Sequence, residues 1–187
     1  NKNILRYLEN KKGSVVIIYS YYSLRILEVN ANNKRYRKML VSESVDEVEK
    51  TIFSKRYETI KKTFINTINQ ISKNHKVILI YPTPEFKIGV PNAIVRKLIF
   101  KNESKIPIIT SDYSFFKNKR KLIYEMLDEI TDKNIEKIYG EKYFCDNYIK
   151  NKCVGNTKER LFFSDNHHLS NHASKFLVDE IINLIKK

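Results

Sequence analysis

Several things are scarce in this sequence of 187 residues: it has no tryptophan, and only four glycines, four prolines and two cysteines. It does not begin with methionine, and no charged segment followed by an apolar run opens it, so neither a start codon nor a signal peptide is represented. No apolar run approaches the roughly 20 residues that cross a bilayer. We therefore expect a piece of a longer protein that does not itself span a membrane.

Positive charge, by contrast, is abundant: 35 lysines and arginines against 21 acidic residues give a net charge of +14. Clustered basic residues suit a nucleic acid or an anionic membrane surface. Here they are scattered along the whole chain, together with many Asn, Ile and Tyr residues, which favours a compositional bias of the kind found in genomes rich in A and T. We expect no nucleic-acid partner, and a basic nucleic-acid-binding domain is the alternative.

The apolar residues alternate between two periodicities. Val15–Tyr19 and Val77–Tyr81 are continuous apolar runs, typical of strands buried on both faces of a parallel sheet. Between them, over residues 45–72, apolar residues recur every three or four positions, which predicts one long amphipathic helix. This alternation favours an α/β fold with a mainly parallel sheet covered by helices, in a single domain over residues 1–187.

The second half of the chain continues the alternation more weakly. Pro82 and Pro84 end the second strand, and Pro107 makes residues 106–109 either a brief edge strand or a connection. The other expected elements are a short helix from Pro91, a helix over 113–130, a short strand over 135–139 and a final helix capped by Ser170.

The two cysteines, Cys145 and Cys153, lie close together in a polar stretch. A disulfide between them would stabilise the fold by about 2 to 3 kcal/mol. It would persist only outside the reducing cytosol. Two unrelated thiols are the alternative, and the residues alone leave both open.

The stretch over residues 162–170 carries the clearest chemistry. Asp165 precedes His168 by three residues, in a loop that leads into the last helix. A histidine takes a proton from an attacking serine only when a carboxylate fixes its tautomer and stabilises the imidazolium. The spacing therefore predicts two members of a catalytic triad. A solvated polar turn is the alternative.

A metal site is the other interpretation of this part of the sequence. Asp165 with His167, His168 and His172 contains a His-x-x-x-His pattern of the kind that binds zinc. The two cysteines are too far apart for a zinc knuckle, which has two to four intervening residues. We expect no metal, and we expect His167 to be exposed on the loop.

The Asp-x-x-His block of Asp165 and His168, followed by Leu169 and Ser170, resembles the end of SGNH hydrolases, in the variant fused to membrane acyltransferases of family 3. Two further features are similar to that variant, and the resemblance runs from about Val15 to the end. They are the proline segment over 81–85 and 90–91, and the paired cysteines Cys145 and Cys153.

The resemblance implies a three-layer α/β/α domain, SGNH- or flavodoxin-like, on the periplasmic or extracellular face of the cytoplasmic membrane. It implies a membrane acyltransferase domain in the same full-length chain and a disulfide between Cys145 and Cys153. The implied activity is O-acylation, in most cases O-acetylation, of a polysaccharide such as O-antigen or peptidoglycan from an acyl donor, without a cofactor. A carbohydrate esterase and a non-catalytic glycan-binding domain are the alternatives.

The sequence departs from the family at the nucleophile. No Gly-Asp-Ser element is present, since Gly13 and Ser14 precede a strand instead of following one. We expect the domain to be truncated at its N-terminus, the serine to lie upstream of Asn1, and the piece to be inactive alone. The glycine and asparagine of the oxyanion hole are also unmatched, so no oxyanion residue is named.

Overall fold

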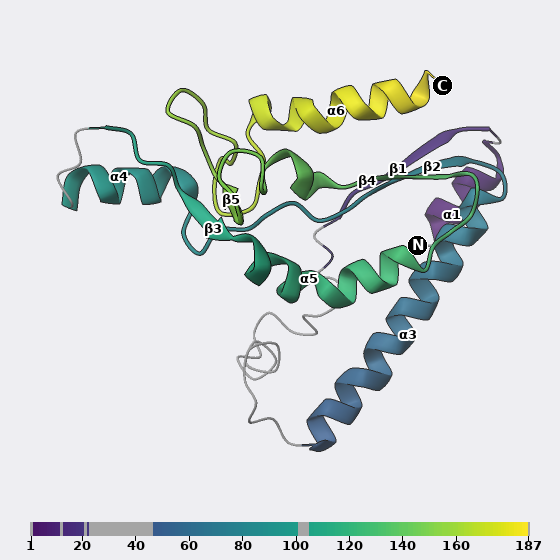
Figure 1. Cartoon of the computed structure of the whole chain (residues 1–187). Coiled ribbons are helices and arrows are strands. Elements are labelled where there is room, and N and C mark those ends of the chain that lie inside the picture. Colours follow the sequence, from purple (N-terminus) through teal and green to yellow (C-terminus); the bar gives the residue numbers. More distant parts are fainter. Residues whose placement is uncertain (1, 12, 21, 23–46, 101–104, 187) are drawn as a thin grey trace. The chain divides into compact units, whose positions relative to one another are not determined.

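The computed structural model describes residues 2–11, 13–20, 22, 47–100 and 105–186 (Figure 1). The chain divides into two compact units, and each is described by itself. The first contains residues 1–79 and 119–137, and the second contains residues 80–118 and 138–187. The expected organisation of residues 1–187 as a single domain stays a prediction.

A three-stranded sheet forms the centre of the α/β fold. Its strands are β1 (Val15–Ile18), β2 (Lys76–Ile80) and β4 (Ile135–Ile138), in the order β1-β2-β4 (Figure 1). β1 and β2 run parallel with Val15 opposite Lys76, and the N–H of Val77 donates to the carbonyl of Asn134 at the start of β4. The predicted parallel α/β fold is confirmed.

The two predicted apolar strands differ in burial. All residues of β2 from Val77 to Ile80 are buried, as expected for a central strand. The prediction that the first strand is buried on both faces is wrong, because Val15 is 36% and Ile17 is 48% exposed. β1 is an end strand of the described sheet, and its side chains alternate between exposed and half-buried, so one face of the strand is covered less than the other.

Helices complete the first unit. The long helix predicted from residue 45 is α3 (Glu47–Ser72), and position 45 itself lies outside the described residues. The hydroxyl of Tyr57 in α3 donates to the carbonyl of Leu122 at 2.7 Å, which joins α3 to the helix that contains Leu122. Among the described residues, α1 (Lys2–Glu9) was not predicted. The helix predicted over 113–130 is α5 (Tyr113–Asp128), which enters this unit at residue 119; the predicted apolar residues Ile123, Met126 and Leu127 of α5 are fully buried, as is Ile130 just after it.

The second unit contains a small antiparallel pair of strands. β3 (Thr110–Asp112) pairs with β5 (Lys152–Val154). Residues 106–109 are a connection and not a strand, because Pro107 has no N–H and the N–H of Ile109 donates to the side chain of Asn156. The remaining elements are α4 (Val90–Phe100), the 3₁₀ helix η2 (Gly140–Tyr143) and α6 (Asn171–Ile185).

An aromatic core holds this unit together. Phe144 and Phe163 pack with ring centroids 5.1 Å apart, and Phe86 packs against Phe163 at 4.9 Å. The other buried members are Val90, Ile109, Val154, Phe162 and Ala173. Phe162 and Phe163 thus place the base of the Asp165 loop directly in the core.

Cys145 and Cys153 form a disulfide, and both residues are buried. The prediction of a covalent link within this loop is confirmed, and the alternative of two unrelated thiols is excluded. Ser170 caps α6 as predicted, because its hydroxyl accepts a hydrogen bond from the N–H of Ala173. Over the described residues, no helix has both the length and the hydropathy to cross a bilayer.

Candidate active site

The predicted catalytic residues lie on a short loop that folds back on itself. Phe163 and Leu169 face each other across an isolated bridge, and the N–H of Ser164 donates to the carbonyl of His168 at 2.9 Å. Asp165 and His168 are therefore brought together by a closed turn whose two ends are fixed on the core.

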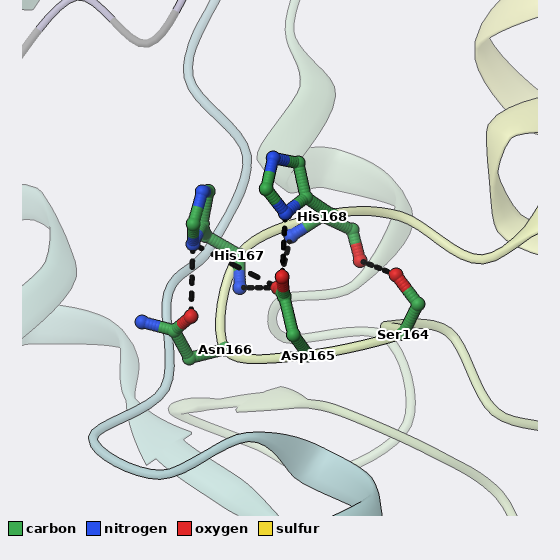
Figure 2. A network of polar contacts seen from close by, with 5 residues as sticks. All are labelled: Ser164, Asp165, Asn166, His167 and His168. Atoms are coloured by element: carbon green, nitrogen blue, oxygen red, sulfur yellow. Dashed lines mark hydrogen bonds and ion pairs between the residues drawn. The ribbon is translucent and has the colours of Figure 1, made fainter.

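The carboxylate of Asp165 organises this turn. Its Oδ1 accepts hydrogen bonds from the backbone N–H groups of His167 at 2.8 Å and His168 at 2.7 Å. Its Oδ2 lies 2.5 Å from Nδ1 of His168 (Figure 2). Burial alone would raise the pKa of Asp165, but these hydrogen bonds outweigh it and hold the pKa well below the usual range of a carboxyl group. Asp165 is thus an anion at neutral pH.

His168 is held on one side only. Nδ1 faces Asp165, while the other ring nitrogen points away from the carboxylate (Figure 2). The side chain is 67% exposed, against 44% for Asp165. An Nδ1–H that donates to the carboxylate leaves Nε2 as the acceptor, which is the tautomer that a general base needs.

The loop is tied to the proline segment that follows β2. The N–H of Phe86 donates to the carbonyl of Asn166 at 2.8 Å, and the N–H of Val90 donates to the carbonyl of Asp165 at 3.0 Å. This segment begins directly after β2, which ends at Ile80. The N–H of Tyr81 still donates to the carbonyl of Ile138 in β4, so the start of the segment is fixed on the neighbouring strand. The site therefore lies beside the chain that leaves the carboxyl end of a parallel strand, where ligands bind in open α/β sheets.

The serines near the site have other partners. The hydroxyl of Ser164 donates to the backbone carbonyl of His168 at 3.2 Å, and that of Ser170 donates to the carbonyl of Leu161 at 2.7 Å. Within the described part of the chain, no hydrogen bond joins a serine hydroxyl to the imidazole of His168. Neither serine is positioned as the third member of a triad.

The neighbouring histidines separate into two groups. His167 is not exposed as expected: its side chain is only 27% accessible, its Nδ1 lies 2.9 Å from Oδ1 of Asn166, and its ring centroid is 3.9 Å from that of His168. His172 stacks instead on Phe162, with centroids 6.3 Å apart. The set of three histidines considered from the sequence is therefore not assembled. The group that does gather, over the described residues, is Asp165, His167 and His168.

The fold and the loop describe a parallel α/β domain with a carboxylate–imidazole pair before its last helix. The family model of the SGNH domain fused to AT3 domains matches residues 1–183. The chain therefore belongs to this family of SGNH domains.

One solved structure similar to this chain is the periplasmic domain of the lipopolysaccharide acetyltransferase of Salmonella ser. Paratyphi A. The two are 19% identical with a TM-score of 0.57, and the match covers 100% of this chain and 62% of that one. At this identity the likeness shows the fold. A search of the curated proteins found no match.

Proposed function

We propose that this chain is part of the SGNH domain of an O-acyltransferase that acetylates a polysaccharide of the cell envelope. The observation that carries the proposal is the hydrogen bond of 2.5 Å between Asp165 and Nδ1 of His168. Family membership and the fold shared with a periplasmic acetyltransferase domain support this reaction class and a location outside the cytoplasmic membrane. Fusion to AT3 domains in this family supports a membrane partner within the full-length chain.

The proposed chemistry is transfer through an acyl-serine. A serine hydroxyl attacks the carbonyl carbon of the acyl donor, and its proton passes to Nε2 of His168. The bond between the acyl carbon and the donor then breaks, and His168 returns the proton to the leaving group. A sugar hydroxyl next attacks the carbonyl carbon of the acyl-serine and gives its proton to His168. The bond between the acyl carbon and the serine oxygen then breaks, and His168 returns the proton to the serine, which leaves the acylated sugar and the free serine.

Asp165 acts in this scheme without changing its own charge. Its hydrogen bonds from two backbone N–H groups keep it ionised while it accepts the Nδ1–H of His168. The negative charge stabilises the imidazolium that forms in each half of the reaction. We place the nucleophilic serine in polypeptide that precedes Asn1, because the serines beside His168 bond to backbone carbonyls.

The test uses the full-length protein with its upstream sequence. Release of acetate from a chromogenic acetyl ester and transfer to a soluble glycan are measured for the wild type, Asp165→Asn and His168→Ala. We expect both variants to lose about 10³-fold or more in kcat, as in other serine enzymes with a triad. Transfer that exceeds hydrolysis identifies a transferase, and hydrolysis alone identifies the carbohydrate esterase.

A matched control is His172→Gln, which replaces a histidine that packs on Phe162 and lies outside the Asp165–His168 pair. We expect it to retain activity within about twofold. Turnover by His168→Ala equal to that of the control would refute the triad assignment and leave a non-catalytic glycan-binding domain as the remaining interpretation.

A further inference from the structure

The loop that carries Asp165 and His168 also brings a third side chain of a type that can ligate metals, that of His167, close to both. One ligand atom from each of Asp165, His167 and His168 lies within 4.8 Å of the other two. Tetrahedral zinc with ligand distances of about 2.0 to 2.1 Å separates its ligands by about 3.3 Å. Nδ1 of His167 is 3.7 Å from Oδ1 of Asp165, so a metal needs a side-chain adjustment in which this nitrogen leaves Oδ1 of Asn166, now 2.9 Å away.

We infer that Asp165, His167 and His168 bind a zinc ion that switches off the proposed catalytic pair. Two imidazole nitrogens and a carboxylate are a donor set that suits Zn²⁺ and not Mg²⁺ or Ca²⁺. The exposure of His168 gives a hydrated ion access and leaves a coordination position for water. Both cysteines of the sequence are in the disulfide, so no thiol competes for the ion.

The inhibition follows from the two nitrogens of the His168 ring, because a metal on Nδ1 decides which nitrogen carries the proton. Zinc takes the lone pair of a neutral imidazole nitrogen. When that nitrogen is Nδ1 of His168, the single ring proton resides on Nε2, and Nε2 has no lone pair left to accept the proton of a serine. The ion also replaces the 2.5 Å hydrogen bond to Asp165 that fixes the active tautomer. The bound enzyme is therefore inactive until the metal leaves.

His167 distinguishes metal binding from catalysis. Its ring centroid is 3.9 Å from that of His168, and its backbone N–H, which any residue supplies, donates to Oδ1 of Asp165. His167→Phe keeps an aromatic ring in this position and removes the ligand nitrogen. His172→Gln removes a histidine that packs on Phe162 and serves as the matched control.

The experiment measures zinc in two ways on the full-length protein, and its inhibition arm rests on the proposed function. Calorimetry with ZnCl₂ measures binding, and each variant's ester turnover with zinc is divided by its own turnover in EDTA. We expect zinc to inhibit the wild type and the His172→Gln control reversibly, with at least about tenfold weaker binding and inhibition in His167→Phe. Mg²⁺ should have no effect.

Two results would overturn the inference: no heat of zinc binding in the wild type, or equal binding and inhibition in His167→Phe. Failure of the proposed function has a different signature. It appears as a His168→Ala enzyme that remains active in EDTA, whatever zinc does to the wild type.

Discussion

The N–H of Val90 donates to the carbonyl oxygen of Asp165 at 3.0 Å, so the first residue of α4 holds the backbone of the aspartate in the proposed triad. Val90 is itself fixed by the core of the second unit, where it is fully buried. Gly155 lies directly against it, because a Cβ on Gly155 would come within 2.6 Å of a Val90 methyl group. The position of the acid thus depends on a glycine that is not in the loop.

We expect Gly155→Ala to destabilise the protein by about 1 to 3 kcal/mol, the usual cost of overpacking a core. The added methyl group must displace Val90 or the ring of Phe86, which would be 3.3 Å away. Urea unfolding checks the stability, and ester turnover checks the displacement of Asp165. Gly89→Ala is the comparison, because the nearest atom to a Cβ on Gly89 would be 3.6 Å away, an ordinary contact. We expect it to lose less than about 1 kcal/mol, because alanine is a poorer residue than glycine at the position before a helix, here α4. Equal losses in the two variants would contradict the packing argument.

Removal of the disulfide should destabilise the folded protein, although the loop that the disulfide closes is short. We expect Cys145→Ala/Cys153→Ala to lose about 2 to 3 kcal/mol in the free energy of unfolding, because the unfolded chain gains conformational entropy. Reduction of the wild type by dithiothreitol should lower the unfolding midpoint to a similar extent without creating a cavity. A midpoint that does not respond to the reductant, or native cysteines that react with a thiol label, would argue against the bond.

The cap of α6 fixes the end of the loop that carries Asp165 and His168. Ser170 accepts from the N–H of Ala173 at 3.2 Å and donates to the carbonyl of Leu161 at 2.7 Å. Ser170→Ala should cost about 1 to 2 kcal/mol, since one helix donor and one carbonyl lose their partner. The matched variant is Ser174→Ala, whose hydroxyl only donates back to Asn171 within the helix, and it should change stability by less than about 0.5 kcal/mol. Thermal unfolding of both variants tests the difference.

Asp112 should make stability fall at acidic pH. The hydroxyl of Ser114, the N–H of Phe115 and the ammonium group of Lys152 hold the pKa of Asp112 below its ordinary value. The ionised carboxylate is therefore favoured in the folded state. Its contribution is complete above the unfolded pKa of about 3.9 and is lost as the pH falls through the lower folded value.

Asp112→Asn keeps the shape of this residue and removes the charge. We expect its unfolding free energy to fall less than that of the wild type between neutral pH and pH of about 3. Asp179→Asn, at an exposed position on α6, is the control and should follow the wild type. If the unfolding free energy falls equally in all three proteins as the pH is lowered, Asp112 does not contribute to the acid sensitivity.

The local elements of the fold were predictable from local patterns. α3, α5 and β2 follow from periodicity, because a helix or a buried strand shows its apolar face within its own residues. The pairing of β3 with β5 was not predicted, because two strands of three residues carry little periodicity and meet only through long-range contacts. The burial of β1 was also not predicted, because its apolar run does not reveal that it is an end strand among the strands that the structure describes.

The sequence by itself determined the pairing of Asp165 with His168, because they are three positions apart and a turn of that length closes through its own hydrogen bonds. Only the tertiary structure decided where that turn lies and which histidine joins it. Those choices depend on Phe86 and Val90, which are far away in the chain, and on the packing of His172 against Phe162. Hydrogen bonds and ring contacts between distant segments leave no periodic trace in the residues that make them.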